Sequence, residues 1–374
     1  TIANTLLDQF DSWCSFSLNC TGLGCTDSLA LNYDIAATID DGSCVYCVYG
    51  CMDSIAPNYD PLATCDDGSC SSPTVYGCTN SLALNYNPNA TFNNGSCTYI
   101  KTYVPDDIFE AWLEGNGYGD GIAFNDSVLT SSISTISQLD LDNKNISDLT
   151  GISDMLALQD LRASDNTISL VDLTGLYNLR EIDLENNDLT QIVLPDSVVE
   201  NAWGCSYPIE SEYWASYCGV EIKLYNNLLT SVIVPAGLKV SRLYLSNNPL
   251  DYLDIQGIGM GEISISNSNL TSVDLSNHNY LRSIQMYDND SLLSFDVKNK
   301  IDLHYINTYD NDLLNNFDLR NTNLVNINGH YFGNNPQLNC ISVSDTLIAN
   351  ILLDQIDSWC SYSLNCTGLG CMDP

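Results

Sequence analysis

The sequence predicts a mainly β, leucine-rich-repeat solenoid that follows small disulfide-stapled acidic repeats with little regular secondary structure. Three observations predict this fold class. Leucine, isoleucine and asparagine recur at intervals of 20 to 22 residues over most of the chain. Near the start, three copies of a shorter pattern each begin and end on a cysteine. A 27-residue segment at one end of the sequence also returns almost unchanged at the other.

Residues 24–100 contain the three acidic cysteine repeats. Each copy spaces its terminal cysteines identically, and a module of this size cannot bury enough apolar surface to fold unaided. We therefore expect one bridge in each copy, contributing roughly 3 kcal/mol, and a further bridge that links copies one and two. The expected pairs are Cys25 with Cys44, Cys51 with Cys70, Cys78 with Cys97, and Cys47 with Cys65.

Residues 101–345 contain the solenoid, which opens with a predicted cap helix over Ile108 to Leu113 that Gly115 and Gly117 end. Beyond this helix, inward leucines and isoleucines stack into one core, and a buried asparagine satisfies backbone groups where each turn leaves its strand. Ten turns are countable, the last near Ile341 and Val343. The asparagine position is held by Asn166, Asn187, Asn227, Asn248, Ser268, Asn289 and Asn311.

One interval in the solenoid is too long, because the equivalent residues Ile182 and Ile222 are 40 positions apart. About 19 residues are therefore inserted near 195–220. Cys205 and Cys218 predict that a disulfide pins this loop. Its aromatic residues suit either a binding device or a hydrophobic plug over an edge of the core.

Residues 1–27 match residues 347–373 at 22 of 27 positions. Because the second copy follows the last turn, we expect residues 346–374 to be the C-terminal cap of the solenoid and the start of a further cysteine repeat. Residues 1–23 are then the cap segment of a preceding solenoid. The duplication indicates a longer array in which solenoids and cysteine repeats alternate.

The remaining cysteines are assigned by arithmetic. Cys340 with Cys366 would pin the cap to the last turn of the solenoid. With this pairing, Cys360 and its equivalent Cys14 have no expected disulfide partner. A buried thiol is favoured there over a bond between units, because each cysteine follows a tryptophan in an apolar cap.

Composition narrows the function and the partners. The chain has 47 Asp plus Glu and 11 Lys plus Arg, and its formal net charge of -36 repels nucleic acid and anionic lipids. The sequence has no run of about 18 apolar residues, so no membrane insertion is expected. The charge suits divalent cations, although it equally serves the solubility of a long exposed solenoid. Sixteen cysteines indicate an oxidising compartment, and we expect a secreted protein, extracellular or on the cell surface.

Calcium is the sharpest candidate cofactor, because Asx residues gather inside the disulfide-closed loops and Ca²⁺ takes six to eight oxygen ligands. In the third copy asparagine replaces every carboxylate, which favours the alternative that these residues cap turns by bonding their own backbone. The candidate ligands are Asp27, Asn32, Asp34 and Asp40 in copy one and Asp53, Asn58, Asp60 and Asp66 in copy two.

Catalysis has little support in the sequence. The three histidines, His278, His304 and His330, fall in different turns, and neither a nucleophile elbow nor an HExxH motif is present. We therefore expect no enzymatic activity.

The concave face of the solenoid is the candidate binding surface, because strand residues that alternate with the core leucines face it. Toward the N-terminal end these residues are acidic: Asp140, Asp142, Glu181, Asp183 and Glu185. Tyrosine offers flat amphipathic contact area for sugars or proteins, although it also simply suits strands. The candidate ligand-binding residues are Tyr225, Tyr244, Tyr287, Tyr305, Asn307 and Tyr309.

The cysteine repeat GC(T/M)D-S-x-A-x-N-Y-(D/N)…(D/N)(D/N)GSC and the solenoid opening VPDD-x-F-E resemble those of large secreted repeat proteins of Bacteroidota. The resemblance covers nearly the whole chain. It implies an adhesin or surface fibre that is exported by the type IX system. It also implies O-glycosylation at Asp-Ser/Thr-aliphatic triplets such as that beginning at Asp126.

These observations predict a structural repeat unit of an extracellular or cell-surface fibre or array, whose units contact end to end. The expected partners are neighbouring copies of the same unit. The alternative is an adhesin that binds a glycan, or a protein of a host or neighbouring cell, through the concave Tyr/Asn face.

Overall fold

The computed structural model describes residues 22–199, 219–255, 259–352 and 356–366. The chain divides into two compact units, Thr1–Tyr99 and Ile100–Pro374. The first unit holds the cysteine repeats, and the second holds the solenoid. No helix in the described ranges combines the length and apolar character that a bilayer-spanning segment needs.

The cysteine repeats contain little regular structure, as expected. Each copy has one pair of two-residue parallel strands. The buried apolar side chains of copy one are Cys25 and Ala30, and the other two copies bury the equivalent cysteine and alanine. The strand pairs are β1 (Leu23–Gly24) with β2 (Ile39–Asp40), β3 (Tyr49–Gly50) with β4 (Cys65–Asp66), and β5 (Tyr76–Gly77) with β6 (Phe92–Asn93).

Disulfides take the place of a hydrophobic core in these repeats. The bonds join Cys25 to Cys44, Cys51 to Cys70, and Cys78 to Cys97, with Cα atoms 4.7, 4.7 and 4.8 Å apart. A fourth bond joins Cys47 to Cys65. These are the four pairs that the spacing predicts in this unit.

The solenoid opens with an antiparallel pair, β7 (Lys101–Tyr103) with β8 (Ser127–Leu129), and two helices, α2 (Asp107–Gly115) and α3 (Thr130–Ile133). Asp106 caps α2, because its Oδ1 accepts hydrogen bonds from the amides of Ile108 and Phe109, both at 3.0 Å. Its Oδ2 accepts from the amide and hydroxyl of Ser147 and the amide of Asp148. One carboxylate therefore fixes both the helix start and the first turn of the solenoid.

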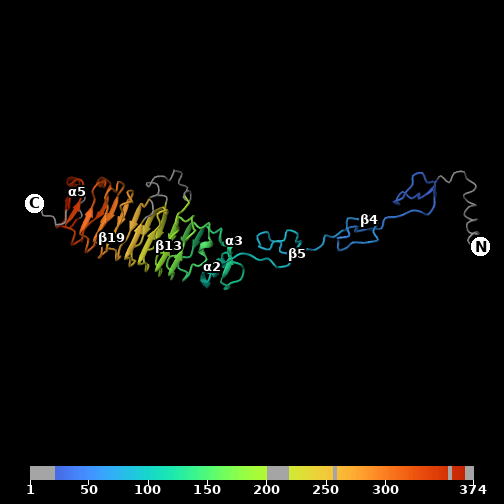
Figure 1. Ribbon diagram of the computed structural model, residues 1–374, viewed down its shortest axis with the longest axis horizontal. Helices are drawn as coiled ribbons and strands as arrows, with labels where there is room; N and C mark the ends of the chain where they lie inside the picture. The colour runs from blue at the N-terminus through green and yellow to red at the C-terminus, as the bar shows by residue number, and fades with distance from the viewer. Residues whose placement is uncertain (1–21, 200–218, 256–258, 353–355, 367–374) are drawn as a thin grey trace, which may run out of the picture. The chain divides into compact units, whose positions relative to one another are not determined.

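Among the described residues, nine parallel strands form the main sheet, stacked as successive rungs in Figure 1. Equivalent residues pair in register, as Leu161 does with Ile182 and Ile182 with Ile222. The strands are β9 (Gln138–Asp140), β10 (Asp160–Arg162), β12 (Glu181–Asp183), β14 (Val220–Lys223), β16 (Val240–Tyr244), β18 (Glu262–Ser264), β20 (Ser283–Gln285), β22 (Tyr305–Asn307) and β24 (Gly329–Tyr331).

The return side of the turns carries three further parallel sheets. Ile341, which the sequence suggests as a tenth turn of the main sheet, lies in β25 on this return side. The sequence suggests that turn because both strands of a turn carry the same alternation of inward residues. The two-stranded sheets are β11 (Leu170–Asp172) with β13 (Gln191–Val193) and β15 (Ser231–Val234) with β17 (Tyr252–Ile255). The five-stranded sheet contains β19 (Ser272–Val273), β21 (Ser294–Asp296), β23 (Asn316–Asp318), β25 (Cys340–Ser342) and β26 (Ser361–Ser363). Two short 3₁₀ helices, η1 (Ile152–Asp154) and η2 (Leu324–Asn326), complete these turns.

The buried asparagines form the ladder that the sequence predicts. In the turn after β16, Asn248 Nδ2 donates to the carbonyls of Leu224 and Leu245, both at 2.9 Å, and its Oδ1 accepts from the amide of Leu229 at 3.1 Å. The preceding residue, Asn247, has a φ of 58°, a left-handed conformation that asparagine tolerates better than most residues. Each such amide joins one turn to its neighbours.

A second column of buried polar side chains follows the five-stranded sheet. His278, Lys300 and Thr322 lie five residues after buried strand residues, and each reaches a backbone carbonyl of the preceding turn. Lys300 is wholly buried, and its Nζ also donates to Lys298 O at 3.1 Å. The three carbonyl partners, in the same order, are Ile255 O at 3.3 Å, Leu275 O at 2.9 Å and Val297 O at 2.7 Å.

The C-terminal cap consists of α5 (Thr346–Leu352) and β26, which pairs with β25. A disulfide joins Cys340 to Cys366, the fifth expected pair that the structure contains. Cys360 is buried beside Tyr362, in agreement with the favoured buried position for this cysteine. The expected bond between Cys205 and Cys218 lies outside the described residues.

Candidate binding face

The outward side chains of the main sheet, hereafter the sheet face, lie in three columns that run across the strands. For β12 the three positions are Glu181 and Asp183 in the strand and Glu185 just after it, and every strand of the sheet has the equivalent three. Alternation buries the intervening residues in the core, so the sheet face is fixed by the same pattern that builds the solenoid.

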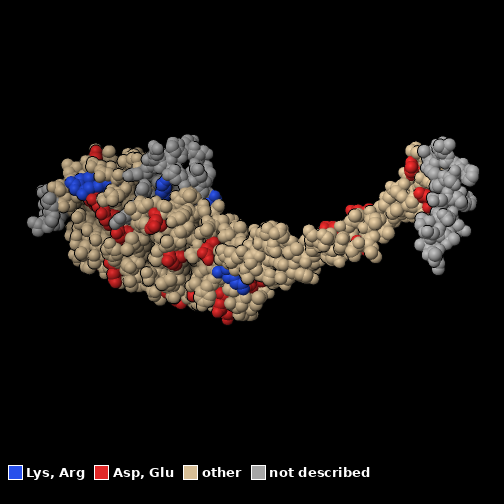
Figure 2. Space-filling view, turned by 45° about the vertical axis from the view of Figure 1, so that its right-hand side comes forward, with Lys and Arg blue, Asp and Glu red and all other residues tan. Residues whose placement is uncertain are grey.

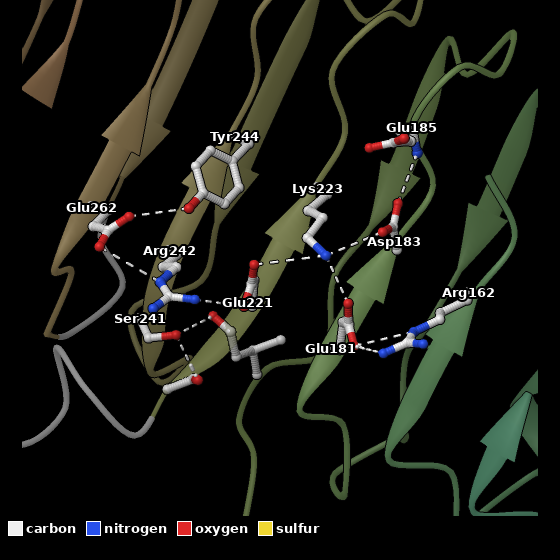
Figure 3. Close-up of polar contacts among 12 residues, drawn as sticks. Arg162, Glu181, Asp183, Glu185, Glu221, Lys223, Ser241, Arg242, Tyr244 and Glu262 are labelled. Atoms are coloured by element: carbon white, nitrogen blue, oxygen red, sulfur yellow. Dashed lines mark hydrogen bonds and ion pairs between the residues drawn. The ribbon is translucent and has the colours of Figure 1, made fainter. Parts of the chain in front are cut away.

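The N-terminal half of the sheet face is a ladder of ion pairs (Figure 3). Lys223 lies at its centre, with Nζ 2.7 Å from Glu181, 3.2 Å from Asp183 and 3.7 Å from Glu221. Arg162 meets Glu181 at 2.8 Å. The charges therefore alternate across strands β10, β12 and β14.

Arg242 continues the ladder onto the next strands. Its guanidinium lies 3.1 Å from Glu221 and 3.7 Å from Glu262, and the hydroxyl of Tyr244 donates to Glu262 at 3.1 Å. The acidic residues expected toward the N-terminal end lie on this face, and basic side chains that the sequence analysis did not single out stand among them. Arg162 was detectable in the sequence, since it holds in β10 the position that Asp183 holds in β12.

Burial and pairing set the protonation of this ladder. Burial raises the pKa of Glu181, but hydrogen bonds from Lys223 and Arg162 outweigh it and leave the pKa below its usual range. For Asp183 burial dominates despite Lys223, and the pKa of its carboxyl is raised. The pKa of Glu185 is raised by burial and by the charge of Asp183. Carboxylates outnumber basic side chains on this half of the sheet face, so the ion pairs neutralise some of them and the others keep a raised pKa.

Lys and Arg occur only after residue 100, so none can neutralise the acidic cysteine repeats from within. Figure 2 shows basic atoms on the solenoid and acidic atoms on both units. The internal ion pairing is therefore a property of the solenoid.

The predicted tyrosines fall into two environments. Tyr244 belongs to the charged half, where burial and the carboxylate of Glu262 raise its pKa to about 12. Tyr225 lies in the turn after β14, next to the charged half of the sheet face. The other candidates lie on β20, β22 and β24 or just after these strands, together with residues that the sequence analysis did not single out. These candidates are Tyr287, Tyr305, Asn307 and Tyr309, and the additional residues are Tyr331, Gly329 and Gly333.

The candidate calcium ligands of copy one each hold a turn of their own loop. Asp27, Asp34 and Asp40 accept hydrogen bonds through Oδ1 from amides two residues ahead, at 2.8 to 3.0 Å. Asn32 bonds the loop's end through the carbonyl of Ser43 and the amide of Val45, both at 2.7 Å.

Copy two repeats these bonds with its own candidate ligands. The amides two residues ahead of Asp53, Asp60 and Asp66 donate to their Oδ1 atoms, and Asn58 bonds Ser69 and Ser71.

The third copy makes the same turns with asparagines, so the turns themselves need no carboxylate. No group of three carboxylates in the described repeats has its oxygens within 4.8 Å of one another. Calcium binding therefore stays a prediction. Calorimetry on EDTA-stripped protein tests it, with no heat on adding millimolar calcium as the contrary result.

One acidic group near the start of the solenoid does have its oxygens within 4.8 Å: Asp107, Glu110 and Asp126. Glu110 is buried and accepts hydrogen bonds from the amides of Asn125 and Asp126 at 3.0 and 3.1 Å. Its carboxylate therefore fixes the loop between α2 and β8.

The three histidines lie in separate turns, as the sequence indicates. His278 is buried against Ile255 O, His304 Nδ1 lies 2.6 Å from Asp302 O, and His330 packs beside Phe332. These surroundings are structural in character.

No protein-family model matches the chain, and no curated protein matches it. A solved structure of the functional domain of InlJ from Listeria monocytogenes, which includes a cysteine ladder, matches with 16% identity and a TM-score of 0.25 over 66% of this chain and 78% of that chain.

Two further solved structures are internalins from Listeria monocytogenes. Internalin InlF matches with 16% identity and a TM-score of 0.38, over 70% of this chain and 77% of that chain. Internalin C2 matches with 18% identity and a TM-score of 0.30, over 70% and 99%. Because the identities are low, the function is argued from this chain's own residues.

Proposed function

We propose that the chain is a structural repeat unit of an extracellular or cell-surface fibre or array, whose units contact end to end. The observation that carries this proposal is the duplicated cap. Residues 347–366 close the last turn of the solenoid, and residues 1–20 repeat their sequence.

The duplicated segment retains the residues that make the cap contacts. Asp357 accepts hydrogen bonds from the amides of Asn334 and Asn335, both at 2.9 Å, and Cys366 is bonded to Cys340. At an offset of 346 residues, Asp357 corresponds to Asp11 and Cys366 to Cys20. The segment therefore has the side chains needed to bind a solenoid end.

The differences between the two copies spare these contacts. Buried Ala349 and Cys360 correspond to Ala3 and Cys14, and buried Tyr362 becomes another aromatic residue, Phe16. Leu347, which is replaced by Thr1, is 69% exposed. Residues 1–20 would thus cap the solenoid of another unit, and the cysteine repeats would tether that unit to this one.

An oxidising location follows from the same chemistry. Five disulfides lie in the described part of the chain, and four of them hold modules that bury few apolar side chains. Such modules depend on cross-links that persist outside the cytosol.

A cysteine exchange experiment tests the proposal. Cys366→Ser frees Cys340 from its own cap, so Cys20 of a second copy can bond to it. We expect disulfide-linked multimers that collapse with reductant, and a Cys20–Cys340 peptide by mass spectrometry. The matched control, Cys20→Ser with Cys366→Ser, should stay monomeric on non-reducing gels. Multimers that persist in this control, or multimers in Cys366→Ser that contain no Cys20–Cys340 peptide, would contradict the proposal.

A second candidate function, adhesion, is favoured by the tyrosine cluster on β20, β22 and β24. An adhesin would bind a glycan, or a protein of a host or neighbouring cell, through these side chains. Tyr287→Ala combined with Tyr309→Ala should then abolish attachment to the target surface while the melting temperature stays unchanged. Retained attachment would argue against this function.

A further inference from the structure

The last three strands of the sheet face differ in chemistry from the rest. Nine of the twelve outward positions on β9, β10, β12 and β14 are charged. The nine outward positions on β20, β22 and β24 contain neither a charged nor an aliphatic side chain. In column order they are Ser283, Tyr305 and Gly329; Gln285, Asn307 and Tyr331; Tyr287, Tyr309 and Gly333.

Gly329 on β24 makes room for the ring of Tyr305. Gly329 pairs with Tyr305 across the strands, and a Cβ at Gly329 would lie 2.6 Å from Cδ2 of that ring. A Cβ at Gly333 would lie 3.7 Å from the ring of Tyr309. The Tyr305 ring therefore occupies the space above a bare backbone.

Four tyrosines form the resulting surface, hereafter the tyrosine platform: Tyr287, Tyr305, Tyr309 and Tyr331. The rings of Tyr305 and Tyr331 have centroids 6.2 Å apart at an angle of 57°. Tyr309 and Tyr331 remain 48% and 45% exposed. A ligand can thus reach the rings without unfolding any part of the sheet.

Amide side chains stand between the rings. Gln285 pairs with Asn307 in the register of β20 and β22, and Asn307 pairs with Tyr331. Asn307 Oδ1 accepts the amide of Tyr309 at 3.0 Å, which fixes the orientation of its side chain. Phenol and amide groups alternate along this segment, in the order Tyr305, Asn307 and Tyr309.

The charge of the molecule indicates which class of ligand the tyrosine platform can bind. An anionic polymer would meet no cation on the platform and a chain of net charge -36 around it. A cationic ligand would favour the carboxylates of the other half. Tyrosine is also common at the centres of protein–protein contacts, so the experiment below separates a protein partner from a glycan.

We propose that the tyrosine platform binds an uncharged glycan, whose sugar rings lie on Tyr305 and Tyr331 while its hydroxyls bond the phenol and amide groups. The inference rests on the adhesive function proposed above and specifies its ligand. Aromatic faces supply contact area with little loss of conformational entropy, and Gly329 leaves the space that the Tyr305 ring occupies.

Binding to immobilised polysaccharides tests this proposal on the full chain. The probes are neutral mannan, xylan, galactan and β-glucan, with alginate as the acidic comparison. We expect retention on at least one neutral polymer and none on alginate. Tyr305→Ala with Tyr331→Ala should weaken binding at least tenfold, and Gly329→Ala should weaken it by displacing the Tyr305 ring. The control Tyr252→Ala removes a 54% exposed tyrosine from the return side and should leave binding unchanged.

Two outcomes would overturn the inference in different ways. Retention on a glycoprotein that survives enzymatic deglycosylation, together with no retention on neutral polymers, would show adhesion to protein and reject the glycan. Failure to bind any polymer or glycoprotein, with an unchanged melting temperature, would reject adhesion as well. Neither outcome affects the cysteine exchange that tests the array.

Discussion

Raising the pH should stabilise the solenoid through a single buried amine, that of Lys300. Burial lowers the pKa of this lysine from its ordinary value of 10.5 to about 8, although Asp296 and Asp274 favour its charged form. Between these two values the unfolded chain binds more protons than the folded chain. The free energy of unfolding therefore rises with pH in this interval, and the penalty for the buried cation is full below about pH 8.

The size of the effect follows from the interval. One proton contributes about 1.4 kcal/mol per pH unit, and about 1.5 units separate the folded pKa from pH 9.5. Lys300 should therefore add about 2 kcal/mol to the free energy of unfolding between pH 7 and pH 9.5.

Urea unfolding of the wild type and Lys300→Met at a series of pH values measures this contribution. The substitution also removes the Nζ hydrogen bonds to the carbonyls of Leu275 and Lys298, but that loss shifts the variant's curve by a constant. The difference between the two curves should therefore change by about 2 kcal/mol over the range. Lys144→Met, at an exposed lysine, is the matched control. Parallel curves for wild type and Lys300→Met would refute the reasoning.

Three further predictions concern other polar contacts. Asp106→Ala removes five hydrogen bonds at a helix start and should lower the free energy of unfolding, measured in urea, by about 3 kcal/mol. Asp107→Ala, at the exposed neighbouring residue, should lower it by less than about 0.5 kcal/mol. Equal losses would contradict the capping role. Asn311→Ala leaves two buried carbonyls and an amide without partners and should cost about 3 kcal/mol by the same measurement, so a cost within error of zero would refute the ladder. Lys223→Met should raise the pKa of Glu181 toward its ordinary range, as followed by NMR of the carboxyl carbon, and destabilise the protein by about 1 kcal/mol at low salt. An unchanged titration of Glu181 would contradict the ion-pair ladder.

Periodicity made most of the fold predictable. Inward aliphatic residues and the recurrent asparagine specify the stacked turns, because both act through local spacing. The cap helix was predictable from Asp106 and the glycines that follow it. Five disulfides were predictable because equal spacing in repeated modules leaves few alternatives. The count of turns was less secure, since Ile341 follows the same alternation on the return side.

The candidate site was harder to predict, because its character depends on register between distant segments. Lys223 lies beside Asp183 only because the chain returns to the sheet after the 40-residue interval. Lys300 carries a charge that usually marks a surface residue, and its position five residues after a strand was the one available signal. The contribution of Gly329 depends on the ring that its neighbour places above it, which a single-strand pattern does not show.

The disulfides of the cysteine repeats determine how this region would respond to mechanical force. Cys25 and Cys44 are 19 residues apart in sequence, yet their Cα atoms lie 4.7 Å apart. A stretched segment of that length would span about 60 Å. Tension along the backbone therefore passes through the sulfur bridge and bypasses the loop. The disulfides of the three repeats together exclude about 180 Å of contour length from stretching. A reductant would make this length available to extension.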